Sequence, residues 1–232
     1  MKTKIFCDIA DYKTIKFFNN KHLIDGFTTN PSLMRLAGAK NYKDYSLKIL
    51  KICKKKPISF EVFGDNENEM LRQAYIMNKW GKNVYVKIPV VNSRGKFTGQ
   101  VISALSKKRV KLNITAVYSI NQVKRILNCL DKKTDTIISI FAGRMADKGK
   151  DPLPIFRKSL SMTKKLKKVK ILWASTREAY NFMQAKEINC DIITMPPKII
   201  DQIYKFGKSF NEMSIDTVKG FLTDSRKSRF KI

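Results

Sequence analysis

Histidine and cysteine are scarce in this sequence of 232 residues, which contains one histidine and four cysteines. The cysteines, Cys7, Cys53, Cys129 and Cys190, are far apart and form no C-x-x-C pair. Zinc sites and disulfide frameworks need such residues at short, characteristic spacings. Their scarcity argues against both kinds of site and fits a protein of a reducing compartment.

Long apolar runs are missing as well. No stretch of the sequence approaches the roughly 20 apolar residues that a membrane-spanning helix needs. The apolar stretch at the N-terminus is short and is interrupted by Asp8, so it does not have the form of a secretory signal. We therefore expect a cytoplasmic protein without a membrane partner.

Acidic residues are few: 19 Asp and Glu stand against 47 Lys and Arg, which gives a formal net charge of +28. Such a charge favours anionic partners, among them nucleic acids and sugar phosphates. Lysine supplies 37 of these cations, and Lys, Ile and Asn together are abundant in proteins from AT-rich genomes, so compositional drift is a second explanation. Because no nucleic-acid-binding motif accompanies the charge, we expect no specific nucleic-acid partner and keep a basic nucleic-acid-binding protein as an alternative.

Short apolar segments alternate with segments of helical periodicity along the whole chain. In the segment 66–80, for example, Met70, Leu71, Ala74 and Met77 share one side of a helix. Eight segments are short and rich in apolar or β-branched residues, as strands are. They are residues 4–9, 24–28, 58–63, 84–90, 110–117, 136–141, 170–174 and 191–194.

Strands that are separated by helices form parallel sheets, because a parallel pair needs a crossover connection. Eight such units predict an α/β fold, a closed (β/α)₈ TIM barrel, which forms a single domain over residues 1–232. A doubly wound open sheet is the alternative, but no Gly-rich nucleotide-binding loop follows any predicted strand. One more helix is predicted after the eighth unit, over residues 214–225.

Five of the predicted strands have one polar face and one apolar face, since side chains along a strand alternate between faces. The polar faces carry Asp8, Ser59, Glu61, Tyr85, Lys87, Asn113, Thr115 and Ser139. In a barrel the apolar faces contact the helices, so we expect the polar groups to converge in the interior. Buried charges need partners, and Asp8, Glu61 and Lys87 can provide them for one another.

Lys87 is the most informative of these residues because it lies in the apolar segment 84–90. Burying an ammonium group is costly, and a desolvated neutral amine can attack a carbonyl to form a Schiff base. The alternative is that the apolar part of the Lys87 side chain is buried while its charged amine reaches water. The carboxylates on neighbouring strands favour the Schiff-base lysine, with Asp8 and Glu61 as candidates for general acid–base catalysis.

Further candidate binding groups follow the ends of other predicted strands. Asn30 precedes a proline, which predicts a helix N-cap and also places an amide at the mouth of the barrel. Arg144 follows the sixth strand, and Ser175 and Arg177 follow the seventh. Ser175 and Glu178 match a capping box, and the helix that they would start suits a phosphate group together with the two arginines.

Seven of these strand ends resemble, in order and spacing, the motifs of the transaldolases. They are FCDIA at 6–10, GFTTNPSL at 26–33, SFEV at 59–62, VKIP at 86–89, NITAVYS at 113–119, SIFAGR at 139–144 and ASTR at 174–177. The elements TTNPS and VKIP together are a specific signal. The resemblance covers roughly residues 4–206, and the length is similar to that of the short-chain subgroup, which includes the fructose-6-phosphate aldolases.

The resemblance implies a class I aldolase barrel that uses neither a metal nor another cofactor. Lys87 matches the Schiff-base lysine, and Asp8 matches the residue that takes the proton from the C4 hydroxyl. Glu61 and Thr115 match the pair that positions a catalytic water. The substrate-binding residues that it implies are Asn30, Asn113 and Ser139 for the dihydroxyacetone unit and Arg144, Ser175 and Arg177 for the phosphate.

Two positions separate the subgroups that the sequence resembles. Glu61 and Phe141 stand where transaldolases have Glu and Phe and where the aldolases have Gln and Tyr, and Asn113 is also transaldolase-like. The resemblance thus implies transfer of a dihydroxyacetone unit from a ketose phosphate, such as sedoheptulose 7-phosphate or fructose 6-phosphate, to an aldose phosphate. Cleavage that releases free dihydroxyacetone is the alternative.

The sequence departs from the usual family pattern at Cys7 and Ile9, on either side of Asp8, and at Ile140, beside Phe141. These departures leave the preferred sugar open and keep a catalytically drifted paralogue as a further alternative. Proteins of this length in the family often form rings in which the last helix reaches a neighbour. The resemblance therefore implies a homo-oligomer, with the helix predicted over 214–225 as a possible assembly arm.

Overall fold

The computed structural model describes residues 3–229 and contains a closed barrel of eight parallel strands. Each strand pairs with the next along the chain, and β8 pairs with β1. The strands are β1 (Lys4–Asp8), β2 (Gly26–Thr28), β3 (Ile58–Glu61), β4 (Val84–Pro89), β5 (Leu112–Val117), β6 (Thr136–Phe141), β7 (Val169–Ala174) and β8 (Ile192–Met195). The predicted (β/α)₈ barrel is therefore confirmed, and the open sheet is excluded because the first and last strands pair.

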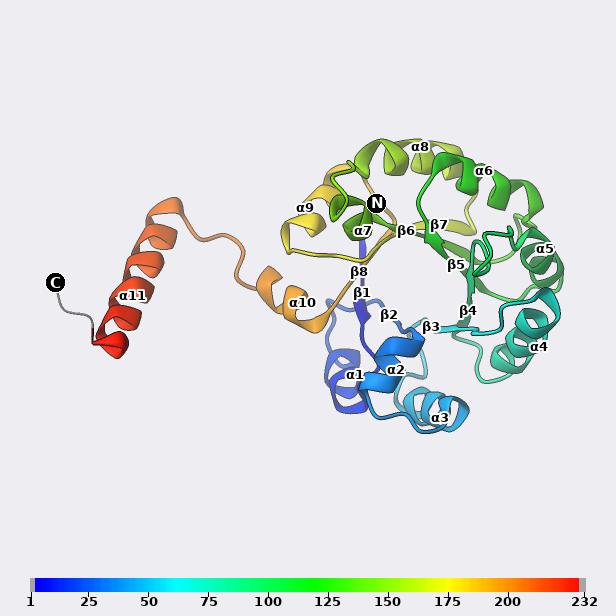
Figure 1. Ribbon diagram of the computed structural model, residues 1–232, viewed down its shortest axis with the longest axis horizontal. Helices are drawn as coiled ribbons and strands as arrows, with labels where there is room; N and C mark the ends of the chain where they lie inside the picture. The colour runs from blue at the N-terminus through cyan, green and yellow to red at the C-terminus, as the bar shows by residue number, and fades with distance from the viewer. Residues whose placement is uncertain (1–2, 230–232) are drawn as a thin grey trace.

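Helices surround the barrel on its outside, and one long helix extends away from it (Figure 1). The helices are α1 (Tyr12–Asn19), α2 (Pro31–Leu36), α3 (Tyr42–Ile52), α4 (Glu67–Asn78), α5 (Gly99–Lys107), α6 (Ile120–Cys129), α7 (Ala142–Ala146), α8 (Leu153–Thr163), α9 (Tyr180–Glu187), α10 (Pro197–Ile203) and α11 (Phe210–Ser228). The short helices α2 and α7 directly follow β2 and β6, so they add to the rim at the C-terminal ends of the strands.

The outer and inner faces of the strands have different surroundings. Outward residues such as Ile5, Phe60 and Ile88 belong to the main core between the strands and the helices. A smaller apolar cluster fills the interior and consists of Phe6, Ile137, Leu172, Ala174 and Ile192. The Phe6 ring lies so close to Gly26 that a Cβ atom there would be 2.6 Å from Phe6 Cζ. This apolar cluster supports the polar side chains nearer the C-terminal ends of the strands.

Strand β5 is irregular near its C-terminal end. Its register against β6 shifts between Ile114 and Val117, and Ala116 has a φ angle of 58°. The left-handed conformation costs a residue other than glycine on the order of 1–3 kcal/mol. The irregularity changes the direction of the side chains that follow it, because after a bulge the alternation between the two faces of the strand is shifted. Thr115 lines the interior cavity, whereas Val117 packs in the outer core instead of sharing the face of Thr115.

The last helix, α11, is longer than the predicted 214–225, because a capping box between Ser209 and Glu212 starts it earlier. None of its residues is buried, although Phe210, Val218 and Phe221 are apolar. It stands apart from the barrel in Figure 1, joined to α10 by residues 204–209. Within residues 3–229, no helix combines the length and the apolar character that crossing a membrane requires.

Candidate active site

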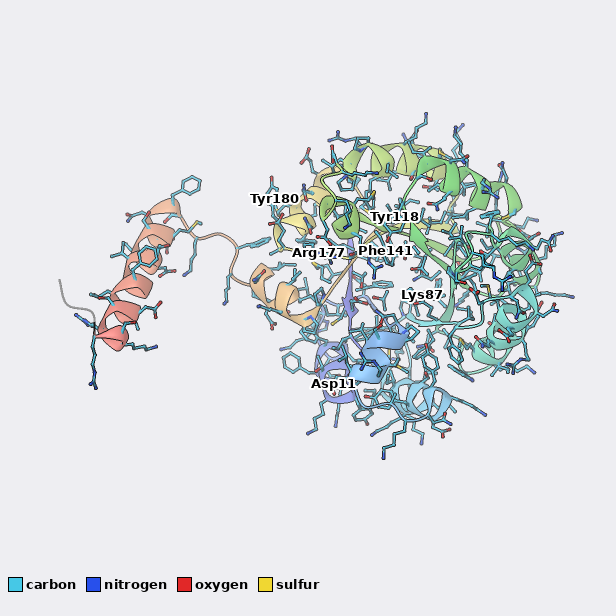
Figure 2. All side chains as sticks on the ribbon, in the orientation of Figure 1. Asp11, Lys87, Tyr118, Phe141, Arg177 and Tyr180 are labelled. Atoms are coloured by element: carbon cyan, nitrogen blue, oxygen red, sulfur yellow. The ribbon has the colours of Figure 1, made fainter. Side chains whose placement is uncertain are left out.

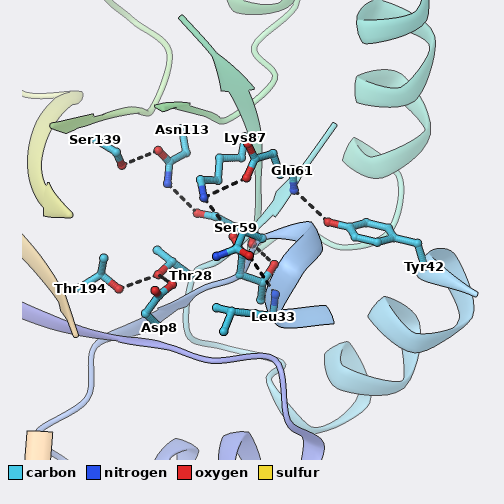
Figure 3. A network of polar contacts seen from close by, with 12 residues as sticks. Asp8, Thr28, Leu33, Tyr42, Ser59, Glu61, Lys87, Asn113, Ser139 and Thr194 are labelled. Carbon is cyan, nitrogen blue, oxygen red and sulfur yellow. Dashed lines mark hydrogen bonds and ion pairs between the residues drawn. The ribbon is translucent and has the colours of Figure 1, made fainter. Parts of the chain in front are cut away.

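Lys87 lies on β4 and points into the barrel interior, where its side chain is enclosed. The residue is 6% exposed. Its Nζ is 3.1 Å from a carboxylate oxygen of Glu61, at the end of β3, and donates a hydrogen bond of 3.1 Å to the carbonyl oxygen of Thr29. Strand pairing explains this contact, because Lys87 and Glu61 are directly opposite in the β3–β4 register. The amine is thus held at one place in the interior (Figures 2 and 3).

Asp8, at the end of β1, belongs to a second group of polar side chains. Thr28 donates a hydrogen bond of 2.7 Å to its carboxylate, and the Thr28 and Thr194 hydroxyls are 2.6 Å apart (Figure 3). Burial raises the pKa of Asp8 above its ordinary value, although the nearby Lys87 and the Thr28 hydrogen bond act in the opposite direction. A carboxyl group in this setting takes up a proton more readily than one in water.

A chain of hydrogen bonds joins side chains of β3, β5 and β6. Ser139 donates to the Asn113 amide oxygen at 2.7 Å, and the Asn113 amide nitrogen donates to the Ser59 hydroxyl at 3.0 Å. All three side chains are buried. Thr115, two residues along β5 from Asn113, also has a buried hydroxyl, and none of residues 3–229 forms a hydrogen bond with it. Its oxygen therefore retains its full capacity to bind a ligand or water.

Helix α7, after β6, and the loop after β7 bring two arginines to the same rim. Arg177 forms a two-pronged ion pair with Asp147, with an Nη2–Oδ2 distance of 2.6 Å and an Nε–Oδ1 distance of 3.0 Å. Gly143 permits the close approach of α7 to the loop after β7, because a Cβ atom there would be 1.7 Å from the Ser175 carbonyl oxygen. Arg144 lies over the ring of Phe141, with its Cζ atom 5.4 Å from the ring centroid.

These groups surround a cavity of about 260 Å³ at the C-terminal mouth of the barrel. Nine of the eleven residues predicted from the sequence line it: Asp8, Asn30, Lys87, Thr115, Ser139, Phe141, Arg144, Ser175 and Arg177. The other two lie one contact behind its wall, Glu61 against Lys87 and Asn113 against Ser139. Elements from across the whole chain thus converge on one site, as the alternation along the strands predicted.

Two local predictions have different outcomes. Asn30 caps α2 as predicted, since its side chain accepts a hydrogen bond of 2.9 Å from the Leu33 backbone, and it lines the cavity too. The capping box of Ser175 and Glu178 is wrong. Helix α9 begins only at Tyr180, and Ser175 instead has a φ angle of 64°, in a loop shaped by its contact with Gly143. The candidate phosphate site therefore combines Arg144 of α7 with the loop residues Ser175 and Arg177, and it contains no capped start of α9.

Three contributors to the site were not predicted. Thr194 on β8 joins the hydroxyl network of Asp8, and Asp147 holds Arg177. The hydroxyl of Tyr42 accepts a hydrogen bond of 3.0 Å from the Glu61 backbone, and its burial raises the pKa of this phenol. Only Thr194 has a signal in the sequence, because it is a polar residue on the inward face of the eighth predicted strand. Tyr42 and Asp147 have none. Among residues 3–229, no three histidine, cysteine or carboxylate side chains come together as metal ligands would.

A comparison with protein families places the chain in a known group. The profile of the family described as Transaldolase/Fructose-6-phosphate aldolase matches residues 5–232. The chain belongs to this family. The resemblance seen in the strand-end motifs is thereby confirmed over almost the whole sequence of this transaldolase-family protein.

Individual relatives agree with this assignment. The chain is 32% identical over 87% of its length to a "Probable transaldolase" of Herpetosiphon aurantiacus, and the match covers 87% of that protein. It is 33% identical to a "Probable transaldolase" of Nitrosopumilus maritimus, with 86% of each chain covered, and 30% identical to one of Methanococcus vannielii, with 95% and 96% covered. The family member described here is therefore similar in length to short proteins of that name.

Solved structures with other names share the fold alone. KGPDC from Streptococcus mutans is 7% identical, with a TM-score of 0.56 over 87% of this chain and 91% of that one. Inosine 5' monophosphate dehydrogenase from Legionella pneumophila is 13% identical, with a TM-score of 0.58 over 84% of this chain, which spans 58% of the dehydrogenase. Both likenesses are to barrels and carry no information on the reaction.

Proposed function

We propose that the protein is a transaldolase, which moves a dihydroxyacetone unit from a ketose phosphate to an aldose phosphate through a Schiff base on Lys87. The observation that carries this proposal is the buried amine of Lys87, 3.1 Å from the Glu61 carboxylate and beside a cavity that Asp8 also lines. Membership of the family supports it, since the family includes transaldolases and fructose-6-phosphate aldolases.

In the first step, the neutral amine of Lys87 attacks the C2 carbonyl of the ketose. The carbonyl oxygen takes up a proton, and loss of one water molecule leaves an iminium ion. We assign the proton transfers to Glu61, through a water bound by Thr115. Two observations support this assignment: Glu61 contacts the Lys87 amine, and the buried Thr115 hydroxyl has no protein partner within residues 3–229.

In the second step, Asp8 removes the proton from the C4 hydroxyl of the bound sugar. The C3–C4 bond breaks, its electron pair moves towards the iminium nitrogen to form an enamine, and the aldose phosphate product leaves. The enamine then attacks the aldehyde carbon of the acceptor, and Asp8 returns the proton to the new hydroxyl group. The raised pKa of Asp8 suits this exchange, because it makes the carboxylate a stronger base.

We assign Arg144, Ser175 and Arg177 to the phosphate of the sugar, because they share one rim of the cavity. Asp147 engages the Nε side of Arg177, which fixes the guanidinium and leaves further N–H groups for a ligand. Replacing Arg144 with glutamine removes one charged contact, so we expect KM for fructose 6-phosphate to rise roughly 10- to 100-fold. The matched control is unphosphorylated fructose, whose turnover should not change. Equal losses for both sugars would contradict the assignment.

Transfer and simple cleavage can be distinguished by whether consumption of fructose 6-phosphate requires an acceptor sugar. For a transaldolase, consumption of fructose 6-phosphate requires an added aldose phosphate, and free dihydroxyacetone does not accumulate. Glu61 and Phe141 favour this outcome through the resemblance of their positions to those of transaldolases. Release of dihydroxyacetone at an undiminished rate without any acceptor supports the aldolase alternative instead.

We also propose that copies of the chain assemble through α11. The helix contacts the barrel so little that Phe210 is 88% exposed and Phe221 70% exposed, and such a bare apolar stripe suits a second copy. Exposed apolar side chains on α9, Tyr180 and Met183, offer a complementary surface on the barrel.

Replacing Phe221 with glutamate is expected to convert the assembly into a monomer of about 26.8 kDa, as measured by light scattering after gel filtration. The apolar stripe would then carry a charge at its centre, which a buried interface does not tolerate. Thr223→Glu, on the opposite side of the helix, is the matched control and should leave the assembly intact. A monomeric wild-type protein would contradict this proposal.

A further inference from the structure

The positive charge of the protein is divided unevenly between the two ends of the barrel. The connections from a helix into β2–β8 lie at the N-terminal end, opposite the cavity, because the strands are parallel. They comprise residues 20–25, 53–57, 79–83, 108–111, 130–135, 164–168 and 188–191, which we call the N-terminal face. These segments contain fifteen lysines and arginines but only four carboxylates.

In the connections at the C-terminal end, positive and negative charges are nearly equal in number. With α2 and α7 included, these connections are longer in total, yet they contain eight lysines and arginines and five carboxylates. Compositional drift towards lysine would add lysines to both ends of the barrel in similar proportion. The excess on the N-terminal face therefore needs another explanation, and capture of substrate is not one, since that face points away from the cavity.

The charges of the N-terminal face are available to a partner. Eleven of its lysines are exposed and take part in none of the ion pairs found in residues 3–229. The densest group is Lys164, Lys165 and Lys167, between α8 and β7. Lys164 and Lys167 also line a hollow of about 660 Å³ beneath α8. The ion pairs Arg109–Asp131 and Lys168–Asp135 neutralise only two of the cations.

The chemistry of the face indicates what kind of polyanion it suits. None of the large exposed apolar side chains lies in these seven segments, whereas membrane-inserting surfaces need such side chains. Protein interfaces are depleted of lysine and enriched in aromatic residues and arginine, but here all but one of the cations are lysine. Lysines act as point charges towards phosphates, which suits the evenly charged backbone of a nucleic acid.

We propose that the N-terminal face binds the phosphate backbone of nucleic acids without regard to base sequence. The binding is electrostatic, so it releases counterions and weakens steeply with salt. The cavity remains open at the other end of the barrel, and catalysis can continue in the bound protein. This inference does not depend on the reaction proposed above.

The test compares two triple variants with equal changes of charge. One carries Lys164→Glu, Lys165→Glu and Lys167→Glu on the N-terminal face. The matched control carries Lys13→Glu, Lys43→Glu and Lys198→Glu, at exposed lysines in the first turns of α1, α3 and α10. Binding of a fluorescent 24-base-pair DNA duplex is measured by anisotropy between 50 and 200 mM salt, and folding of each variant is checked by thermal unfolding.

We expect the wild type to bind the duplex, with log K falling linearly against log salt. The variant of the N-terminal face should bind at least roughly tenfold more weakly at 50 mM salt, with a salt slope smaller by about 2.7, since each lost phosphate contact removes about 0.9. The control should keep its slope within about 1.

Three results would overturn the proposal. Equal weakening in the two triple variants would show that overall charge, and not this face, attracts the duplex. Absence of wild-type binding at 50 mM salt would remove the activity altogether. Tighter binding to vesicles that contain 30% phosphatidylserine than to the duplex, compared at equal phosphate concentration, would identify a membrane surface as the partner.

Discussion

Replacing Lys87 with methionine is expected to abolish the reaction, lowering kcat/KM for fructose 6-phosphate by about four orders of magnitude or more. Methionine is similar in length but has no nucleophile, so no Schiff base can form. Glu61 loses its ion-pair partner, yet its side chain is 20% exposed, so its charge keeps contact with water. We therefore expect the variant to fold, and circular dichroism with steady-state kinetics checks both statements.

Lys170→Met is the matched control for this substitution. Lys170 also lies on a strand and pairs with a carboxylate, Asp191, at 3.1 Å, but it is at the N-terminal end of β7. Its replacement should leave kcat within about threefold of the wild type, since it lies far from the cavity and a paired surface charge contributes little. Residual activity of a tenth or more in the Lys87→Met protein would show that another group carries the reaction.

Asp8→Asn should separate the two halves of the reaction. The variant keeps Lys87 and Glu61, so the Schiff base still forms, but the group that removes the C4 proton is lost. General-base catalysis contributes about 10²- to 10⁴-fold, and kcat should fall by that amount. Trapping with borohydride should then yield an adduct of the whole six-carbon sugar, because the C3–C4 bond remains intact. A three-carbon adduct formed at the wild-type rate would contradict the role of Asp8.

The same substitution has a predicted effect on stability, and its sign follows from the pKa of Asp8. Burial raises that pKa in the folded state, so the native protein binds a proton more tightly than the unfolded chain does. The contribution of Asp8 to stability is therefore lost as pH rises through its folded pKa. Asp8→Asn should gain stability relative to the wild type between pH 4 and pH 7, as measured by urea unfolding.

Asp11 provides a control of opposite sign. Hydrogen bonds from Thr14 lower the pKa of Asp11, which caps α1, so its contribution is present above its unfolded pKa and is lost as pH falls. Asp11→Asn should therefore lose stability relative to the wild type as pH rises from about 2 to about 4, where the wild-type carboxyl ionises. Parallel changes in the two variants would show that the burial of Asp8 is not the cause.

The barrel and most of the cavity follow from the sequence for one physical reason. A parallel strand alternates its side chains strictly, so a polar residue between apolar ones, such as Lys87 or Ser139, must point away from the helices. Closure of the barrel then brings the inward polar groups near the C-terminal ends of the strands to one place. The register of β3 and β4 sets Glu61 opposite Lys87, and no other part of the fold has to be known to expect that pair.

What the sequence did not reveal depends on contacts between segments far apart in the chain. Tyr42 reaches Glu61 from the start of α3, and Asp147 reaches Arg177 across two loops. Neither contact has a local pattern. The bulge at Ala116 breaks the alternation that predicts every other inward residue of β5, and the loop conformation of Ser175 overrides a local capping pattern because Gly143 packs against it.

The central claim is that the amine of Lys87 bonds covalently to the sugar. Incubation with fructose 6-phosphate and sodium borohydride, followed by digestion and peptide mass mapping, tests it most directly. The account predicts a reduced three-carbon adduct on Lys87 in the wild type and no adduct at that position in Lys87→Met. An unmodified Lys87 in protein that turns over the sugar, or an adduct on a different lysine, would contradict it.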